Sequence, residues 1–544
     1  MAWQQIYDPV GNIWLSGLVA LTPILFFFFA LLVLKLKGHI ACTITVGITL
    51  AIAILFYKMP ALTAVSAGLY GFSYGLWPIS WIIIGAVFLY KISVKTGHFD
   101  IIRHSISSVS EDHRIQVLLV AYSFGGFLEG AAGFGAPVAI TTALLVGLGV
   151  PAITAGGLCL IANAAAGAFG AMGIPVIVGA QVIGAAPDAV SAHVGYLQMV
   201  IAFIIPIWLV AMSDGLRGLR EIWPAIFVAG ASFALLLGGT AVFIGPELPD
   251  IIAPLGTLII LPFFLRFWQP KHIFKFKNDT QAVTPAVTAR ACSMAEIARA
   301  WSPFVILTFC VALWSLKPVK RLFAAGGPLN WTTLTFNFPG LHDKVLKSPP
   351  LTDMPTPYHA VFHLDFISCV GTAIILSAII SVFVLRMKPA VAAETFFETI
   401  SSLKISIYAI GMVLTFAFLA NYSGLSTTLA LVMARSGRAF TFFSPVLGWL
   451  GVFLTGSDTS SNALFGGLQA ATGRQIGVTA DILIAANTVG GAVGKMISPQ
   501  SIAVASAAVG LTGQEGKLLG FTLKCSIILA LLCGAATSLL VYIF

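Results

Sequence analysis

The amino-acid sequence predicts an all-α polytopic membrane protein built from two inverted repeats that contain broken helices or re-entrant hairpins. Of 544 residues, 58% are hydrophobic and only 9% are charged, whereas about one quarter of the residues in soluble domains are charged. Apolar runs of membrane-spanning length recur from Ile13 to the end of the chain. Glycine-rich stretches interrupt several of these runs, and two of the stretches resemble each other.

Two pairs of matching motifs indicate an internal duplication. F-L-x-G begins at Phe127 and again at Phe453, and N-x-x-x-G-A-x-G-x-M-x-x-P begins at Asn163 and again at Asn487. The two displacements are nearly equal, 326 and 324 residues, so the halves of the chain correspond. Paired interruptions at corresponding places in two halves are typical of the binding site of a membrane transporter.

The most polar and basic stretch divides the chain. Residues 1–265 form the first membrane repeat, residues 266–299 a cytoplasmic linker, and residues 300–544 the second repeat, which includes an extracytoplasmic loop at residues 317–360. The formal net charge of +9 is concentrated between the spans, where it indicates membrane topology rather than affinity for nucleic acid. The seven cysteines lack any C-x-x-C spacing and are expected to be buried as small apolar side chains.

Apolar length predicts the spans of the first repeat. The first run exceeds the core of a signal peptide and is expected to stay as a span. The expected segments are Ile13–Leu36, His39–Tyr57, Leu62–Tyr90 with a break at Trp77-Pro78, Ile115–Val150 interrupted near Glu129, Ala152–Ala186 interrupted after Asn163, Gly195–Met212, Ile222–Ile244 and Ile251–Phe267.

The second repeat continues the pattern, for roughly 12 to 14 crossings or half-crossings in all. Its expected segments are Ala300–Leu316, Phe366–Leu385, Ile405–Ala434 with a break at Asn421–Gly424, Phe440–Gln469, Val478–Leu511 and Phe521–Phe544. When the orientation of the chain is followed through these spans, the segment with Glu129 enters from the cytoplasm and the segment with Asp458 enters from outside. The two repeats are therefore expected to be inverted. Arg435 and Arg438 then fall outside, against the positive-inside rule.

Three ionisable residues, Glu129, Asp458 and Lys495, lie in the broken segments. Each costs about 2.5–3.5 kcal/mol at membrane depth unless it faces a cavity or a partner; capping a half-helix or forming a structural ion pair is the alternative role. The candidate substrate-binding residues surround them and are Gly130, Gly133, Gly135, Asn163, Ser457, Asp458, Thr459, Ser460, Ser461, Asn462, Asn487, Lys495, Ser498 and Gln500.

Both carboxylates are candidates for proton coupling, with different expected roles. Glu129 is the preferred proton carrier, because desolvation among Phe127, Leu128 and Ala131 should favour the neutral acid. Asp458 lies among hydroxyl and amide groups that can hydrogen-bond its ionised form, so we assign it to organising the polar loop and the hydroxyl of the substrate. The same hydroxyl-rich stretch could equally coordinate Na⁺, which leaves a sodium-coupled carrier as the alternative.

Enzyme motifs are weak in this chain. Gly71-Phe72-Ser73-Tyr74-Gly75 matches G-x-S-x-G but lies inside an apolar run without the strand that a nucleophile elbow requires. Gly494-Lys495 ends like a phosphate-binding loop, but Val489 stands at the position of its first glycine. We expect no catalytic residues, metal or cofactor. An intramembrane enzyme is the alternative from another class.

Long motifs along the whole chain give it a family likeness. They are W-Q-Q-x-Y-D-P-x-G-N-I-W-L-S at Trp3–Ser16, L-W-P-I-S-W at Leu76–Trp81, K-I-S-V-K-T-G-x-F-D-I-I-R at Lys91–Arg103, F-L-E-G-A-A-G-F-G-A-P-V-A-I-T at Phe127–Thr141, F-L-T-G-S-D-T-S-S-N-A-L-F at Phe453–Phe465 and G-K-M-I-S-P-Q-S at Gly494–Ser501. On these motifs the chain resembles the bacterial L-lactate permease family, the 2-hydroxymonocarboxylate:proton symporters.

The resemblance implies proton-coupled uptake of L-lactate, with D-lactate and glycolate as further substrates, by a multi-pass protein of the bacterial inner membrane. It also implies an elevator-like architecture, no cofactor, and the lipid bilayer, protons and a small monocarboxylate as partners. One stretch departs from the family pattern. Asn163 is followed by Ala164-Ala165-Ala166-Gly167 rather than Thr-Ala-Pro-Val, a change that bears on substrate preference and on local backbone shape.

Overall fold

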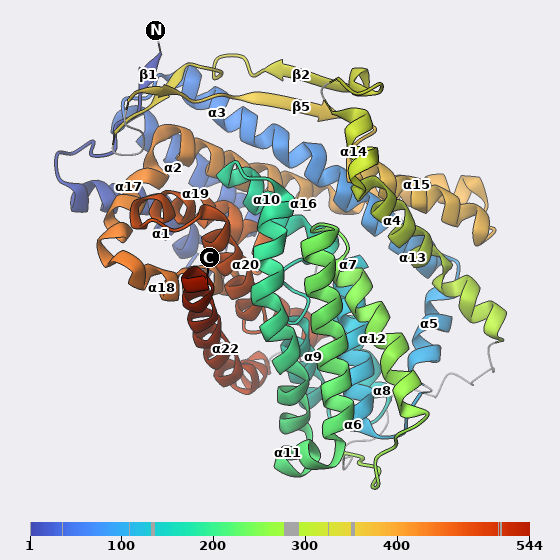
Figure 1. The fold of residues 1–544 in the computed structure, drawn as a ribbon. Helices are drawn as coiled ribbons and strands as arrows, with labels where there is room; N and C mark the ends of the chain where they lie inside the picture. The colour runs from blue at the N-terminus through green and yellow to red at the C-terminus, as the bar shows by residue number, and fades with distance from the viewer. Residues whose placement is uncertain are drawn as a thin grey trace.

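The computed structural model describes residues 2–34, 36–107, 109–131, 136–276, 293–324, 326–349, 354–509, 511 and 514–543. It consists mostly of α-helices packed side by side (Figure 1). Within the described residues, seven helices are long and apolar enough to cross a membrane. The predicted polytopic α-helical architecture is therefore confirmed.

The helices of the first half follow the predicted apolar runs. They are α1 (Ile13–Leu32), α2 (Gly38–Leu55), α3 (Ala61–Tyr74), α4 (Trp81–Lys95), α5 (His98–Ser107), α6 (His113–Gln116), α7 (Gly125–Ala131), α8 (Ala136–Gly147), α9 (Ala152–Asn163), α10 (Ile174–Ile183), α11 (Pro187–Phe243) and α12 (Pro249–Leu265). The π-helical segments η1 (Gly75–Ser80) and η2 (Val117–Phe124) join α3 to α4 and α6 to α7, and a short 3-10 turn, η3 (Ala171–Gly173), precedes α10.

The helices of the second half follow an elaborated connection. Its helices are α13 (Met294–Ser315), α14 (Lys317–Phe323), α15 (Val370–Val384), α16 (Pro389–Ser423), α17 (Leu425–Met433), α18 (Phe440–Thr455), α19 (Asp458–Ile476), α20 (Ala480–Lys495), α21 (Pro499–Ala508) and α22 (Glu515–Ile543), with 3-10 turns η4 (Asn330–Thr332) and η5 (Ala434–Ala439). α16 begins at Pro389 rather than at Ile405, because its charged first turns lie against α4, where Glu398 pairs with Lys91 and Lys95.

Three of the predicted breaks are present among the described residues, whereas the residues just after Glu129, 132–135, lie outside them. α9 ends at Asn163 and α10 begins at Ile174, while α18 and α19 are separated by Gly456 in the left-handed conformation (φ 71°). α16 ends at Ser423, and the following Gly424 also has a positive φ of 90°, a conformation that glycine adopts without steric cost. The interruptions predicted from glycine and polar residues are therefore real ends of helices.

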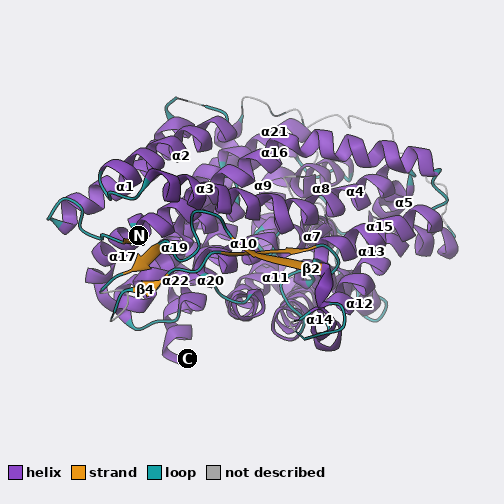
Figure 2. Cartoon of the chain, turned by 90° about the horizontal axis from the view of Figure 1, so that it is seen from above, coloured by secondary structure: helices purple, strands orange, loops and turns teal. Residues whose placement is uncertain are grey.

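A small β structure covers one end of the helices and was not predicted. β1 (Trp3–Gln4) pairs in parallel with β3 (Val345–Lys347), which pairs antiparallel with β4 (Thr356–Pro357). β2 (Thr333–Asn337) and β5 (Val361–Asp365) form an antiparallel pair with Thr333 opposite Asp365. The strands lie along the upper edge in Figure 1 and over α10 and α19 in Figure 2.

Helix α11 identifies the two faces of the protein. Asp188 in its first turn pairs with Lys320 of α14 (3.2 Å), on the strand side, and Asp214 near its kink pairs with Arg114 at the start of α6 (2.8 Å). The helical stretch between the two aspartates is about 39 Å long at 1.5 Å per residue, enough to cross a bilayer. We call these the strand face and the Arg114 face.

The two broken hairpins enter from opposite faces, as predicted for inverted repeats. The α6–α7 segment begins at the Arg114 face, whereas the α18–α19 hairpin opens at the strand face, where Arg474 near the end of α19 lines a small pocket with Lys347 and Tyr358. Arg435 stacks over Trp14 at the start of α1 (4.9 Å from the ring centroid). This arginine therefore lies on the strand face, as the inverted topology requires.

Candidate functional site

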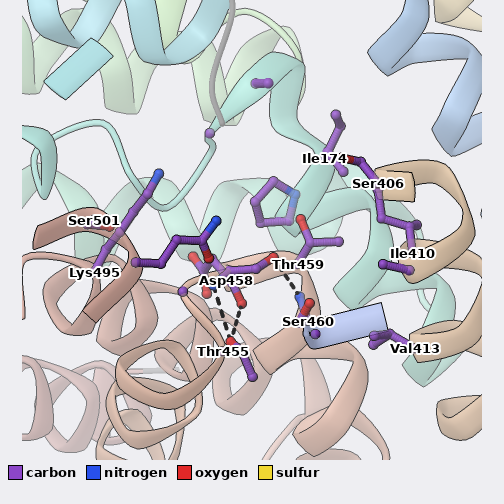
Figure 3. Close-up of a pocket in the computed structure, with 18 of the residues that line it drawn as sticks. Ile174, Ser406, Ile410, Val413, Thr455, Asp458, Thr459, Ser460, Lys495 and Ser501 are labelled. Atoms are coloured by element: carbon purple, nitrogen blue, oxygen red, sulfur yellow. Dashed lines mark hydrogen bonds between the residues drawn. The ribbon is translucent and has the colours of Figure 1, made fainter. Parts of the chain in front are cut away.

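The site lies between two groups of helices. In the framework bundle (α1–α4, α13, α15 and α16), α3 packs along α16, and α15 packs against α4 and α13. In the broken-helix bundle (α6–α12 and α18–α22), α18 packs on α20 and α22, and α10 on α19. A cavity of about 420 Å³ lies at their boundary, with Ile405–Val413 of α16 on one side and the breaks of the second bundle on the other (Figure 3).

Glu129 and Lys495, 366 positions apart in the chain, form an ion pair beside this cavity. Lys495 Nζ is 2.5 Å from Glu129 Oε1, and Asn163 Nδ2 donates to Glu129 Oε2 at 2.8 Å. The Glu129 side chain is only 2% exposed and that of Lys495 is 15% exposed. Glu129 thus has a partner for each carboxylate oxygen, and the ion pair joins the first repeat to the end of α20 in the second.

Asp458, at the start of α19, is buried without comparable partners. Its side chain lines the cavity, and neither carboxylate oxygen has a hydrogen-bond partner among the described residues. The neighbouring hydroxyls are engaged elsewhere: Ser457 Oγ accepts from the Ser460 amide (3.3 Å), and Thr455 Oγ1 donates to the Gly451 carbonyl (2.7 Å). Figure 3 shows Asp458 and Lys495 near each other on this wall.

The environments expected for the two carboxylates are therefore reversed. The sequence neighbours of Glu129 are apolar, but tertiary contacts bring Lys495 and Asn163 to it. The sequence neighbours of Asp458 are hydroxyls, but the turn of the helix directs them to backbone groups instead. The composition of the neighbouring residues did not predict these environments, because residues adjacent in a helix face different directions.

The amides predicted to bind substrate instead form a network behind the cavity wall. Asn462 Nδ2 donates to the Pro175 carbonyl (2.9 Å) and to Thr488 Oγ1 (2.8 Å), while its Oδ1 accepts from Asn487 Nδ2 (2.8 Å). Gln469 Nε2 donates to Asn487 Oδ1 (3.1 Å). This buried network fixes the start of α10 against α19 and α20, so these residues position the site rather than line it.

The predicted site residues thus divide into three groups. The cavity is lined by Glu129, Ser457, Asp458, Thr459, Ser460, Lys495 and Gln500. The residues that lie outside the lining are Gly130, Asn163, Ser461, Asn462, Asn487 and Ser498. Gly133 and Gly135 fall outside the described residues.

Asp250, in the first turn of α12, is a buried carboxylate that was not among the candidate site residues. It is 1% exposed, and neither of its side-chain oxygens has a hydrogen-bond partner among the described residues. Gly130 packs against its backbone, since a Cβ added to this glycine would lie 2.5 Å from the Asp250 carbonyl oxygen. Asp250 therefore lies directly behind Glu129. The sequence signal that could have identified Asp250 is its position at the start of an apolar helix.

The cavity-lining residues of the framework bundle were also not predicted from the sequence. His39 of α2 and Ser406 of α16 line it together with apolar side chains such as Ile83 and Ile410. These residues lie away from the glycine-rich breaks of their segments, so nothing in their local sequence distinguishes them from lipid-facing or packing positions.

Two helix N-termini, those of α10 at Ile174 and α19 at Asp458, border the cavity. Unpaired N–H groups and the helix dipole make such ends suited to a carboxylate. The stretch Ala164-Ala165-Ala166-Gly167, which differs from the family pattern, is held by hydrogen bonds: the Ala164 and Ala165 carbonyls each accept from Gln198 Nε2 at 2.7 Å. A Cβ added to Gly167 would lie 3.2 Å from Ala492 Cβ, so the two N-x-x-x-G-A motifs pack against each other here.

Comparisons with known proteins identify the family of this chain. The model of the L-lactate permease family matches residues 16–544. The chain is 55% identical to an L-lactate permease of Escherichia coli (strain K12) over 99% of this chain and 98% of the relative. It is 53% identical to the glycolate permease GlcA of the same organism (100% and 99% covered) and 46% identical to an L-lactate permease of Bacillus subtilis (strain 168) (100% and 99%).

Among solved structures, the YdaH transporter of Alcanivorax borkumensis aligns over 84% of each chain with a TM-score of 0.43 and 14% identity. The family is established by the sequence matches, which cover nearly all of the chain. This multi-pass helical protein, with paired breaks around a central cavity, belongs to the L-lactate permease family.

Proposed function

We propose that this protein takes up L-lactate and glycolate, with D-lactate as a further substrate, by proton symport across the bacterial plasma membrane. The names of its relatives give the substrate class. The observation that carries the proposal is the cavity between the two bundles, which combines a lysine, an unpaired carboxylate and two helix N-termini. Transport, rather than catalysis, is the activity that this arrangement serves.

The cavity offers complementary groups for a 2-hydroxymonocarboxylate. The substrate carboxylate is placed at the N-terminus of α19, where backbone N–H groups and the helix dipole favour an anion. Thr459 and Ser460 in the first turn of α19, together with Gln500, supply donors and acceptors for the substrate hydroxyl. Lys495 adds a positive charge that partly offsets the carboxylates around it.

We assign the transported proton to Asp458 rather than to Glu129. An ionised carboxylate buried without a hydrogen-bond donor is costly, and binding a proton removes that cost. Glu129 already has Lys495 and Asn163 to stabilise its charge. A substrate anion at the start of α19 would be repelled by ionised Asp458 and accepted beside the neutral acid. Binding of each therefore favours binding of the other, which is the thermodynamic requirement for symport.

The position of the cavity also supports an elevator-like movement. Its walls come from two bundles that are each packed internally, so one bundle can slide along the other without breaking its own core. The broken-helix bundle carries Glu129, Asp458 and Lys495, and α16 of the framework presents a largely apolar surface to it. We propose that the broken-helix bundle carries the substrate across.

Reconstituted uptake tests the function. Purified protein in proteoliposomes is supplied with labelled L-lactate under separately imposed gradients of pH and sodium. Accumulation should follow the inward proton gradient, approaching tenfold per pH unit for one proton per lactate. Asp458→Asn should abolish this accumulation while lactate exchange remains measurable. Uptake that follows sodium and ignores pH would instead favour the sodium-coupled carrier, with Ser457–Ser460 supplying oxygen ligands.

A further inference from the structure

A cluster of histidine and aspartate side chains lies on the strand face, remote in sequence from the transport site. His342 and Asp343 follow β2, and His359 precedes β5; each offers one ligand atom, and these atoms all lie within 4.8 Å of one another. Asp343 stands between the two rings, with Oδ1 2.6 Å from His359 Nδ1 and Oδ2 3.2 Å from His342 Nε2. Two imidazoles and one carboxylate thus converge on one point.

The backbone beside His342 accommodates either tautomer of its ring, including the one that a metal needs. Its Nδ1 lies 3.2 Å from both the amide nitrogen and the carbonyl oxygen of Ala360. Nδ1 can therefore accept from the amide or, when protonated, donate to the carbonyl. In the second case Nε2 has a free lone pair directed toward Asp343. Histidines that bind metal commonly donate their other ring N–H to a backbone carbonyl in this way.

We propose that His342, Asp343 and His359 bind one divalent transition-metal ion, Zn²⁺ above all, at the strand face. Two imidazole nitrogens and a carboxylate oxygen suit Zn²⁺, whereas Mg²⁺ and Ca²⁺ prefer oxygen ligands alone. The side chains are 20%, 45% and 68% exposed for His342, Asp343 and His359 respectively, so the ion enters from solvent. Water completes the tetrahedron.

The bound ion would brace the strands against the framework bundle. The backbone carbonyl of His359 accepts from the Tyr422 hydroxyl near the end of α16 (2.8 Å), and Tyr358 stacks on the Tyr422 ring with centroids 4.0 Å apart. Fixing His359 to Asp343 and His342 therefore links the turn after β2 to α16, the helix that lines the transport cavity. The ion acts as a structural clamp and takes no part in binding the substrate.

Calorimetric titration with Zn²⁺ alone tests the site, using tag-free protein in detergent because a polyhistidine tag binds the same ion. Wild-type protein should bind one Zn²⁺ per chain at this site, and His359→Ala and His342→Ala should each weaken binding by more than about tenfold. His363→Ala is the matched control: this exposed histidine lies in β5 and pairs with Thr335 Oγ1 (3.2 Å) instead. Its Zn²⁺ affinity should equal that of the wild type.

A second measurement separates binding from folding. Saturating Zn²⁺ should raise the thermal unfolding temperature of the wild type and of His363→Ala, and should leave that of His359→Ala unchanged. Lactate uptake without added metal should be the same in all three proteins, which shows that the variants are folded. Absence of a Zn²⁺ site in the wild type, or equal affinity in His359→Ala, would overturn the proposal.

Discussion

Replacing Lys495 by methionine tests whether the ion pair with Glu129 holds the two repeats together. Glu129 is 2% exposed, and without Lys495 it keeps only the hydrogen bond from Asn163 (2.8 Å). Removing one partner of a buried pair costs about 3–5 kcal/mol. We therefore expect Lys495→Met to lose about 3–5 kcal/mol of unfolding free energy at pH 7.

The free energy of unfolding can be measured by titration with SDS in mixed micelles. Reaction of a fluorescent thiol reagent offers an independent readout, because Cys42, Cys159 and Cys525, among others, are buried free thiols in the folded protein.

A double variant supplies the control. Glu129→Gln keeps an acceptor for Asn163 but needs no cation, so Glu129→Gln/Lys495→Met should recover most of the stability that Lys495→Met loses. If Lys495→Met unfolds with wild-type free energy at pH 7, or if the double variant is no more stable than Lys495→Met alone, the pair does not have the structural role inferred from its geometry.

Two further predictions follow from single contacts. Gly491→Ala would place a methyl group against Asp458 Oδ1. Overpacking of this kind costs about 1–3 kcal/mol, so the free energy of unfolding in SDS should fall by about that amount, whereas Gly239→Ala, which meets nothing within 4 Å, should leave it unchanged. The hydrogen bond and ion pair with Arg114 lower the pKa of Glu221 from 4.5 to about 2. This contact therefore stabilises the fold fully above about pH 4.5, and its contribution is lost as the pH falls through about 2. Glu221→Gln should reduce the slope of the free energy of unfolding against pH in that window, and an unchanged slope would contradict this prediction.

The sequence by itself determined the class of the protein and the places where its helices break. Composition is sufficient for the first, because a bilayer accepts only long apolar segments with few charges. The breaks were predictable because their signals are local: glycine adopts the left-handed conformation seen at Gly456 and Gly424, and the repeated motifs at Asn163 and Asn487 fixed which breaks correspond.

Tertiary structure decided what each polar residue of those breaks does. Sequence neighbours suggested a desolvated Glu129 and a hydrogen-bonded Asp458, but the partner of Glu129 is Lys495, 366 positions away, and the hydroxyls beside Asp458 bond to backbone instead. The cavity-lining segment of α16 has no local signature at all. Membrane spans and helix breaks depend on a residue's own hydropathy and backbone, so they can be predicted along the chain. Ion pairs and cavities depend on which distant segments meet, and those contacts form only when the helices pack.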